Sequence, residues 1–233
     1  MVQRAGVHFF LFEDCLIRVP TDGLTPKFGS VLLVRHLPLQ PGDVVLDLGA
    51  GAGLIGILAA RRGHRVVATD VVPAYVECLQ ANALLNGVAG RLDVRAGDLF
   101  EPVRGEVFDV IAANPPQMPT PPDRDWSDPQ SRTDNGGPDG WLLLDRIIRQ
   151  SPPHLKPGGR LVLTLFGFLG IERAMEALRG AGLQPRVVAR EDQPFPRLAR
   201  ERLDYIRSVS PDSAGLTGRP STCSRLVLCG RKE

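Results

Sequence analysis

Short apolar runs of strand length alternate with amphipathic segments along most of this chain. Seven such runs follow residue 42, at 44–48, 65–69, 92–95, 107–113, 159–165, 184–189 and 225–229. Between them lie segments with helical spacing, such as 73–85, which aligns Val72, Tyr75, Val76, Leu79 and Ala83 on one face. Strands that alternate with helices predict a parallel sheet covered on both faces. We therefore expect an α/β fold of the Rossmann-like, doubly wound type, with a mostly parallel seven-stranded sheet.

The residues before this alternation predict a small β-rich extension. Apolar runs at 8–12 and 15–19 flank two acidic residues and predict a hairpin. A short helix is expected from Gly29 to Leu37, ended by Pro38. We expect one domain over residues 1–233, with 1–30 as the hairpin extension and 31–233 as the Rossmann-like core.

Two stretches interrupt the alternation. Residues 114–137 contain six prolines among many polar residues, and residues 191–222 contain one short predicted helix at 197–206. Loops this long inside a compact domain are usually functional or mobile. The first of them directly follows a predicted strand, which makes it a candidate part of a site.

Composition and charge exclude several classes of protein. The 28 basic and 26 acidic side chains give a net charge of +2, which argues against a global polyanion-binding surface. No stretch reaches the roughly 18 apolar residues of a membrane span, and the N-terminal apolar run is too short for a signal peptide. The four cysteines form no C-x-x-C pair and the four histidines lack ligand spacing, so no metal site is predicted. These features predict a cytoplasmic protein without membrane association.

A glycine-rich turn follows the first strand of the alternating set. Gly51, Gly53 and Gly56 satisfy G-x-G-x-x-G, in which glycines let the backbone approach a ligand at a helix N-terminus. Asp70, at the end of the next strand, is placed to accept hydrogen bonds from ribose hydroxyls. This turn alone fits a nicotinamide or flavin cofactor as well as S-adenosylmethionine.

Two further features favour S-adenosylmethionine. Asp47 ends the first strand, where a carboxylate suits the ammonium group of an amino-acid cofactor and would repel a pyrophosphate. The fourth strand of the set runs directly into Asn114-Pro115-Pro116-Gln117. The Asn114 side-chain oxygen and the Pro115 carbonyl can each accept a hydrogen bond from an N–H group, which orients a nitrogen lone pair for methyl transfer.

These residues carry a resemblance to a known family. The segment 47–53, then Asp70, Gly97-Asp98-Leu99 and Asn114-Pro115-Pro116-Gln117, in this order, resemble a class I S-adenosylmethionine-dependent N-methyltransferase of the HemK-like group, the protein-glutamine N5-methyltransferases. The resemblance covers about residues 25–190. It implies S-adenosyl-L-methionine as cofactor and S-adenosyl-L-homocysteine as product.

The resemblance and the chemistry together assign roles. Asn114 and Pro115 are the expected catalytic residues, and Pro116, Gln117 and Trp126 the expected substrate-binding residues. The expected cofactor-binding residues are Ser30, Asp47, Gly49, Ala50, Gly51, Asp70, Val71, Asp98, Leu99 and Asn114. Gln117 departs from the family, which usually has Tyr or Phe there: either its amide hydrogen-bonds the acceptor, or the stacking partner comes from elsewhere, such as Trp126 or Phe195.

The local charge bears on the acceptor. Residues 114–140 carry five aspartates against two arginines, which disfavours phosphate backbones. The chain also lacks the large helical N-terminal domain of bacterial release-factor methylases, which makes release factor a doubtful acceptor. We expect N-methylation of an amide or amine in a protein, peptide or small metabolite. The alternatives are a base of RNA or DNA, reached through the arginines of 197–207, a nicotinamide-dependent oxidoreductase, and a non-catalytic partner subunit.

Overall fold

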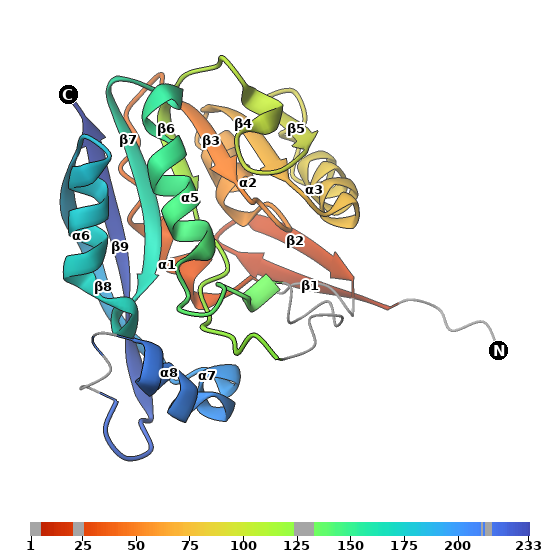
Figure 1. Ribbon diagram of the computed structural model, residues 1–233. Helices are drawn as coiled ribbons and strands as arrows, with labels where there is room; N and C mark the ends of the chain where they lie inside the picture. The colour runs from red at the N-terminus through yellow and green to blue at the C-terminus, as the bar shows by residue number, and fades with distance from the viewer. Residues whose placement is uncertain (1–5, 21–25, 124–132, 211, 213–215) are drawn as a thin grey trace.

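A seven-stranded, mostly parallel sheet forms the centre of the molecule in a computed structural model, which describes residues 6–20, 26–123, 133–210, 212 and 216–233 (Figure 1). Its strands run in the order β5-β4-β3-β6-β7-β9-β8, with β9 antiparallel to both of its neighbours. The strands are β3 (Val44–Leu48), β4 (Arg65–Asp70), β5 (Leu92–Ala96), β6 (Phe108–Ala113), β7 (Leu155–Phe166), β8 (Leu183–Pro194) and β9 (Thr222–Lys232). The predicted fold class is confirmed.

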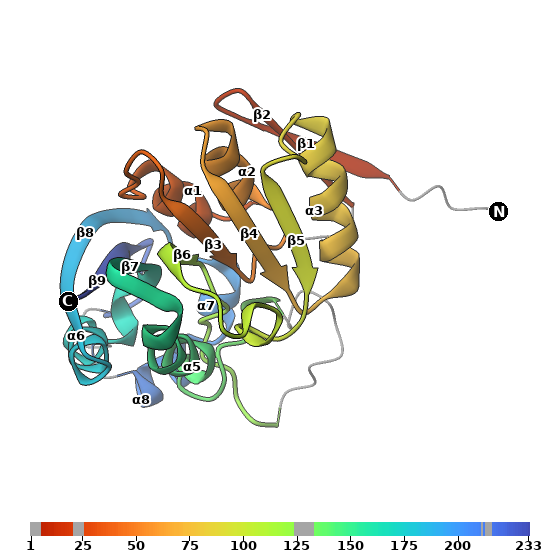
Figure 2. The same ribbon diagram turned by 90° about the horizontal axis from the view of Figure 1, so that it is seen from above.

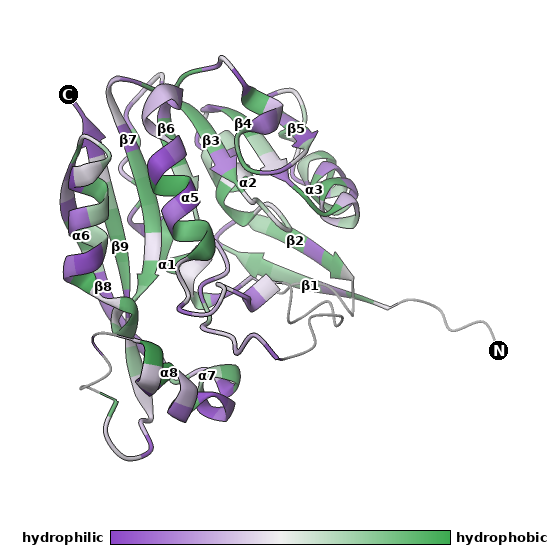
Figure 3. Ribbon diagram, in the orientation of Figure 1, coloured by the Kyte–Doolittle hydropathy of each residue, from purple (hydrophilic) through white to green (hydrophobic). Residues whose placement is uncertain are grey.

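Helices cover both faces of this sheet (Figure 2). One face carries α1 (Phe28–Arg35), α2 (Leu54–Arg61) and α3 (Pro73–Leu85), and the other carries α5 (Leu142–Gln150) and α6 (Ile171–Gly180). Successive residues of the central strands point into two separate hydrophobic cores. Val45 and Val110 face α2, whereas Leu46 and Ile111 face α5. The central strands are accordingly hydrophobic along their length (Figure 3).

The C-terminal strands are longer than their apolar runs predict. The pattern predicts strands over 184–189 and 225–229, whereas β8 and β9 pair from Leu183 with Lys232 to Pro194 with Thr222. The extra residues include Glu191 and Asp192, because beyond the core these two strands pair with each other and need no apolar face. The short helices α7 (Arg197–Glu201) and α8 (Leu203–Val209) follow β8 at that end (Figure 1).

The predicted N-terminal hairpin forms a separate two-stranded sheet, β1 (Val7–Phe12) and β2 (Cys15–Pro20). Asn82 of α3 and Asn86, which caps the end of that helix, hold the hairpin. Asn82 Oδ1 accepts from the N–H of Arg18 and its Nδ2 donates to the Arg18 carbonyl, both at 2.9 Å. Asn86 makes the same pair of bonds to Leu16. Asn82 Nδ2 also donates to Ala52 O in the glycine turn. The hairpin covers a second stripe of α3, so Cys78 and Asn82 are buried beside the predicted apolar face.

The carboxyl ends of the parallel strands gather the predicted motifs at one edge. The glycine turn follows β3, Asp70 ends β4, Asp98 follows β5 and Asn114 follows β6. Crevices at this edge are the usual ligand sites of open α/β sheets. Within the residues that the structure describes, no helix has the length and apolar character to cross a membrane.

Candidate active site

A cavity of about 500 Å³ lies over the glycine turn, and we call it the glycine-turn cavity. Its walls come from the four strand ends, from α1 and from α5. The predicted residues that line it are Ser30, Gly49, Ala50, Gly51, Asp70, Val71, Asp98, Leu99, Asn114, Pro115 and Pro116. Nine of the ten cofactor-binding candidates therefore share one cavity.

The glycine turn is open toward this cavity. Gly49 and Gly51 have φ values of +70° and +56°, a region that favours glycine, and a Cβ at either position would meet no atom within 4 Å. At Gly53, by contrast, a Cβ would lie 1.9 Å from Leu79 Cδ1 of α3. The first two glycines therefore leave space for a ligand, and the third lets α2 pack against α3.

Asp70 is held at the centre of the cavity wall by backbone N–H groups. Its Oδ2 accepts from Gly51 N at 2.8 Å and its Oδ1 from Val72 N at 2.9 Å. Burial raises the pKa of this carboxyl, and the N–H donors partly offset the rise. Each oxygen keeps a lone pair, so the carboxylate fits the two hydroxyls of a ribose.

Asp47 is the cofactor-binding candidate that the cavity does not include. It is fully buried behind the glycine turn, where its Oδ2 accepts from Gly56 N of α2 at 2.8 Å. Burial raises its pKa to about 7, with a further rise from Asp70, and its Oδ1 has no partner in the described part of the chain. The arrangement fastens α2 to β3 and gives no direct contact with an ammonium group.

The β5 loop closes the other side of the cavity. Leu99 has a φ of +47°, and its carbonyl accepts from the Thr69 hydroxyl. Asp98 is paired with Arg146 of α5. The loop is therefore braced against β4 and α5, with the Asp98 carboxylate and the Leu99 side chain at the wall.

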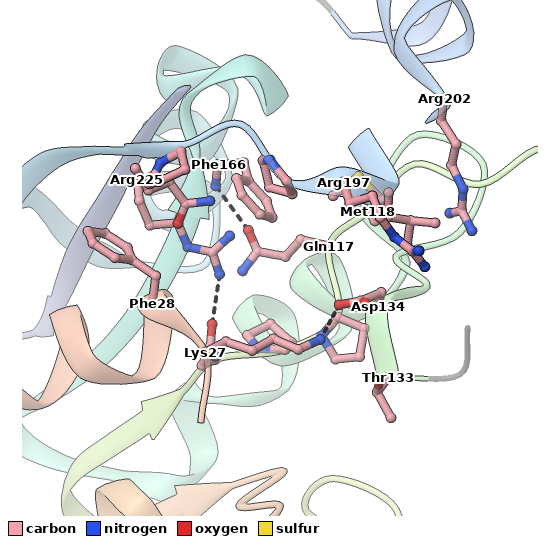
Figure 4. A pocket seen from close by; sticks show the side chains of 18 of the residues that line it. Lys27, Phe28, Gln117, Met118, Thr133, Asp134, Phe166, Arg197, Arg202 and Arg225 are labelled. Carbon is pink, nitrogen blue, oxygen red and sulfur yellow. Dashed lines mark hydrogen bonds and ion pairs between the residues drawn. The ribbon is translucent and has the colours of Figure 1, made fainter. Parts of the chain in front are cut away.

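A second cavity of about 510 Å³ adjoins the first, and we call it the Arg225 cavity (Figure 4). Its walls come from the start of α1, the segment after β6, the end of β7, α7 and β9. Both cavities are lined by Pro26, Lys27, Asn114, Pro115, Pro116 and Thr133. The Asn-Pro-Pro segment is thus the boundary between two spaces, each large enough for a small molecule.

The Asn114 side chain is held at this boundary by three hydrogen bonds. Its Nδ2 donates to Ser30 Oγ at 2.8 Å, and its Oδ1 accepts from Thr164 Oγ1 at 2.6 Å and from Arg225 Nη2 at 2.7 Å. Contacts from α1, β7 and β9 therefore fix the plane of the amide. The oxygen that the sequence assigns to an acceptor N–H already accepts two bonds.

Gln117 lines the Arg225 cavity with its amide turned into β7. Its Nε2 donates to the carbonyl and hydroxyl of Thr164, and its Oε1 accepts from Phe166 N at 3.1 Å. It is only 2% exposed, so it anchors the Asn-Pro-Pro segment to β7. Of the alternative stacking residues, Phe195 is buried against Phe168, and Trp126 lies outside the described residues.

Sequence reasoning missed the residues that the C-terminal strands bring to this site. Arg225 of β9 is 4% exposed, and its guanidinium lies over the Phe166 ring at 3.8 Å. Burial lowers its pKa to about 9, which leaves it charged at neutral pH. Phe28 supplies a second ring to the lining (Figure 4). Arg225 directly precedes a run of apolar residues, Leu226–Cys229, that is buried on both faces of the sheet, and a charged residue adjoining such a run is the one sequence signal for it.

Comparison with known proteins agrees with this geometry. Residues 25–120 match the family Methyltransferase small domain. A putative protein N5-glutamine methyltransferase of Methanocaldococcus jannaschii is 35% identical over 187 residues, 80% of this chain and 93% of that protein. A release factor glutamine methyltransferase of Cereibacter sphaeroides is 37% identical over 183 residues, and this chain spans 64% of its length. This chain matches 52% of the length of the release factor glutamine methyltransferase of Aquifex aeolicus.

Solved structures confirm the fold. The E. cuniculi Mtq2-Trm112 complex, described as methylating the eRF1 translation termination factor, matches 91% of this chain and all of its own at a TM-score of 0.63 and 19% identity. A T. thermophilus 16S rRNA N2 methyltransferase in complex with AdoMet and guanosine matches the whole of this chain and 52% of its own chain. The TM-score is 0.60 and the sequence identity is 19%. Together with the sequence relatives, these findings establish that the chain belongs to the HemK-like family of S-adenosylmethionine-dependent methyltransferases, the protein N5-glutamine methyltransferases.

Proposed function

We propose that this chain transfers a methyl group from S-adenosylmethionine to a nitrogen atom, preferably a side-chain amide, of a protein or peptide. The observation that supports this most strongly is the meeting of the two cavities at Asn114, Pro115 and Pro116. An in-line displacement needs a methyl donor on one side of such a boundary and a nitrogen on the other. Membership in the family removes the nicotinamide alternative.

The glycine-turn cavity fits the cofactor, whose sulfonium supplies an electrophilic methyl group when it is bound. Asp70 would hold the ribose, and the backbone of Gly49 and Gly51 would contact the methionine end. Leu99 and Asp98 would meet the adenine. The open space above Gly49 and Gly51 and the spare lone pairs of Asp70 support this assignment.

The Asn-Pro-Pro segment would orient the acceptor. The Pro115 carbonyl can accept one N–H of the target, and the ring of each proline limits rotation of the segment. Asn114 would accept the second N–H after one of its present donors moves away. Both contacts would stabilise the positive charge that develops on nitrogen as the methyl group transfers.

The contacts of the C-terminal arginines favour a protein or peptide acceptor over a nucleic acid. Arg197 pairs with Glu201, Arg202 donates to Pro119 O, and Arg207 donates to Leu216 O and pairs with Asp204. These guanidinium groups are engaged within the protein, which leaves fewer of them for a phosphate track. We further propose that residues 1–233 act as one catalytic domain, since the hairpin shares a core with α1 and α2.

The names of the relatives make translation termination factors the first acceptors to test. The chain would be incubated with radiolabelled S-adenosylmethionine and, separately, a termination factor, glutamine-containing peptides and total RNA. We expect label in protein or peptide, located by mass spectrometry on a side-chain amide and absent with Asn114→Ala. Label confined to RNA would contradict the proposed acceptor, and failure to bind S-adenosylhomocysteine would contradict the cofactor assignment.

A further inference from the structure

Arg225 is a buried cation whose hydrogen bonds are incomplete. Among the described residues, Nη2 alone has hydrogen-bond partners, Asn114 Oδ1 at 2.7 Å and Thr164 Oγ1 at 2.8 Å. Nε and Nη1 have none within the described residues, and both atoms are closed off from water. A buried polar group without a partner is costly, and a buried charge without an opposite charge is more so.

The other cations that line the Arg225 cavity are all engaged. Lys27 pairs with Asp134, Arg197 pairs with Glu201, and Arg202 bonds to Pro119 and Thr120. No described carboxylate lies within ion-pair distance of Arg225. Arg202 and Arg225 donate to neutral oxygens, and of these two Arg225 is the one that contacts Asn114 at the reacting centre.

The start of α1 adds positive potential at the same place. The helix has no side-chain cap at Lys27 and no acidic residue in its first turn. The Arg225 guanidinium packs directly on it, since a Cβ at Gly29 would lie 2.7 Å from Nη2 and 2.9 Å from Nε. The positive end of a helix and a guanidinium that adjoin each other both favour an anion between or beside them.

We propose, resting on the function above, that Arg225 recognises a carboxylate of the acceptor and by doing so releases the Asn114 oxygen for the target nitrogen. Drawn toward the cavity by the anion, the guanidinium gains partners for Nε and Nη1 and gives up its bond to Asn114 Oδ1. That oxygen then has a free lone pair for the acceptor N–H. The acceptors selected in this way carry a carboxylate close to the amide or amine that is methylated.

A carboxylate fits this site better than a phosphate. The guanidinium lies between the Phe166 ring and Gly29, and a planar carboxylate can pair with two of its N–H groups once it has moved toward the cavity. The lining also contains Asp134 and Glu201, which would repel a phosphate dianion more strongly than a single carboxylate. The carboxylate can belong to a free amino-acid-like metabolite or to the C-terminus of a peptide.

The test compares two probes that differ in one group. Glutaramate carries a primary amide and a carboxylate, and glutaramide has a second amide in place of the carboxylate. Both would be titrated by calorimetry into the chain saturated with S-adenosylhomocysteine. We expect glutaramate to bind at least about tenfold more tightly, because hydrogen bonds to charged groups contribute that much. Equal affinities in the wild type would overturn the proposal.

The variants assign the preference to one side chain. Arg225→Gln should abolish it, whereas Arg173→Gln should keep it, because Arg173 lies over the Trp141 ring at 4.2 Å outside the cavity. Gly29→Ala keeps the charge but places a methyl group against both Arg225 Nη2 and Asn114 Oδ1. It should reduce the preference, and it replaces Arg225→Gln in the test if that variant unfolds. A preference that persists in both Arg225→Gln and Gly29→Ala would overturn the assignment.

Further measurements distinguish a peptide C-terminus from a free metabolite as the source of the carboxylate. They also test the anion site separately from the proposed function. A glutamine-ending peptide would be compared as free acid and as C-terminal amide; a preference for the acid supports a peptide source, and a preference seen only with glutaramate supports a metabolite. The affinity of inorganic phosphate would be measured by competition with glutaramate. If phosphate binds more tightly than glutaramate, the site does not select a carboxylate, and the proposal is overturned. Selective glutaramate binding by a chain that does not bind S-adenosylhomocysteine would support the anion site and contradict only the proposed function.

Discussion

Arg225 Nη2 lies 2.7 Å from Asn114 Oδ1, although the two residues are 111 positions apart in the sequence. The bond joins the last strand of the sheet to the Asn-Pro-Pro segment at the boundary of the two cavities. It makes the orientation of the Asn114 amide depend on β9 as well as on β6. The predictions below follow from this arrangement and from the contacts around the glycine turn.

Replacing Asn114 by alanine should lower kcat about a hundredfold or more, the usual effect of removing a preorganised polar contact to the reacting group. Affinity for S-adenosylhomocysteine should stay within a few-fold, because Asp70 and the glycine turn remain intact. Turnover would be followed by radiolabelled methyl transfer and affinity by calorimetry. Ser30→Ala, which removes only the partner of Nδ2, should have a smaller effect on turnover. Unchanged turnover in Asn114→Ala would contradict the proposed role.

Asp70→Ala should weaken binding of S-adenosylhomocysteine by about 10- to 100-fold, since hydrogen bonds to a charged group contribute about 1.5–3 kcal/mol. It removes the ribose acceptor and also leaves Gly51 N and Val72 N without their partner. Calorimetry gives the dissociation constant directly. Asp93→Ala on the neighbouring strand removes an exposed carboxylate outside the cavity and should leave the affinity unchanged. An Asp70→Ala chain that binds as tightly as the wild type would exclude ribose recognition by this residue.

Asp47 should make the protein less stable as pH rises. Its folded-state pKa is about 7 and that of an unfolded chain about 3.9. Between these values the folded state holds a proton that the unfolded state has lost, so stability falls as pH rises from about 4 to about 7 and then levels off. Asp47→Asn should remove this slope and raise stability at pH 8 by at most about 4 kcal/mol, measured by urea unfolding at several pH values.

Asp109 provides the opposite control. Burial alone would raise its pKa, but the Lys156 ammonium and Val44 N–H lower it overall. Its stabilisation is therefore present above the unfolded pKa and is lost in acid. Asp109→Asn should destabilise the protein at pH 8, where Asp47→Asn stabilises it. A gain from Asp47→Asn that is the same at pH 5 and at pH 8 would show that Asp47 is already ionised at pH 5 in the folded protein and would contradict the raised pKa.

Asn82→Ala should destabilise the protein by about 2–4 kcal/mol, because the backbone groups of Arg18 and the Ala52 carbonyl lose buried hydrogen bonds. Gln80→Ala, at an exposed position of the same helix, should change stability by less than about 0.5 kcal/mol. Thermal unfolding would compare the two. Because Ala52 belongs to the glycine turn, Asn82→Ala should also weaken S-adenosylhomocysteine binding, and an unaltered affinity would show that the turn holds its shape without the hairpin.

The alternation of apolar runs was sufficient to predict the sheet, its helices and the N-terminal hairpin. It failed at the ends of β8 and β9, where the charged residues Glu191 and Asp192 lie in strands that backbone pairing extends beyond the apolar runs. Backbone pairing between two strands needs no apolar pattern once neighbouring strands hold them in register. Such extensions leave no periodic signal in a single sequence.

The motifs located most of the glycine-turn cavity and only part of the Arg225 cavity. Asp47 was expected beside the ligand, but the alternation of side chains along β3 turns it toward Gly56 and away from the cavity. Thr164 and Arg225 are isolated residues of C-terminal strands with no motif around them. Their position at the site depends on strand order, which brings β7 and β9 together beside β6.

Because β8 and β9 are long, the C-terminal part of the chain reaches the Arg225 cavity but not the glycine-turn cavity. The glycine-turn cavity takes its walls from residues 26–147, whereas the Arg225 cavity adds Phe166, residues 193–202 and Arg225. Under the proposed function, the residues that the C-terminal strands add to the Arg225 cavity would take part in acceptor selection, and the glycine-turn cavity would hold the methyl donor. Exchanging residues 183–232 between relatives would alter acceptor choice while leaving the methyl-donor site in place, which allows new acceptors to evolve without rebuilding the chemistry.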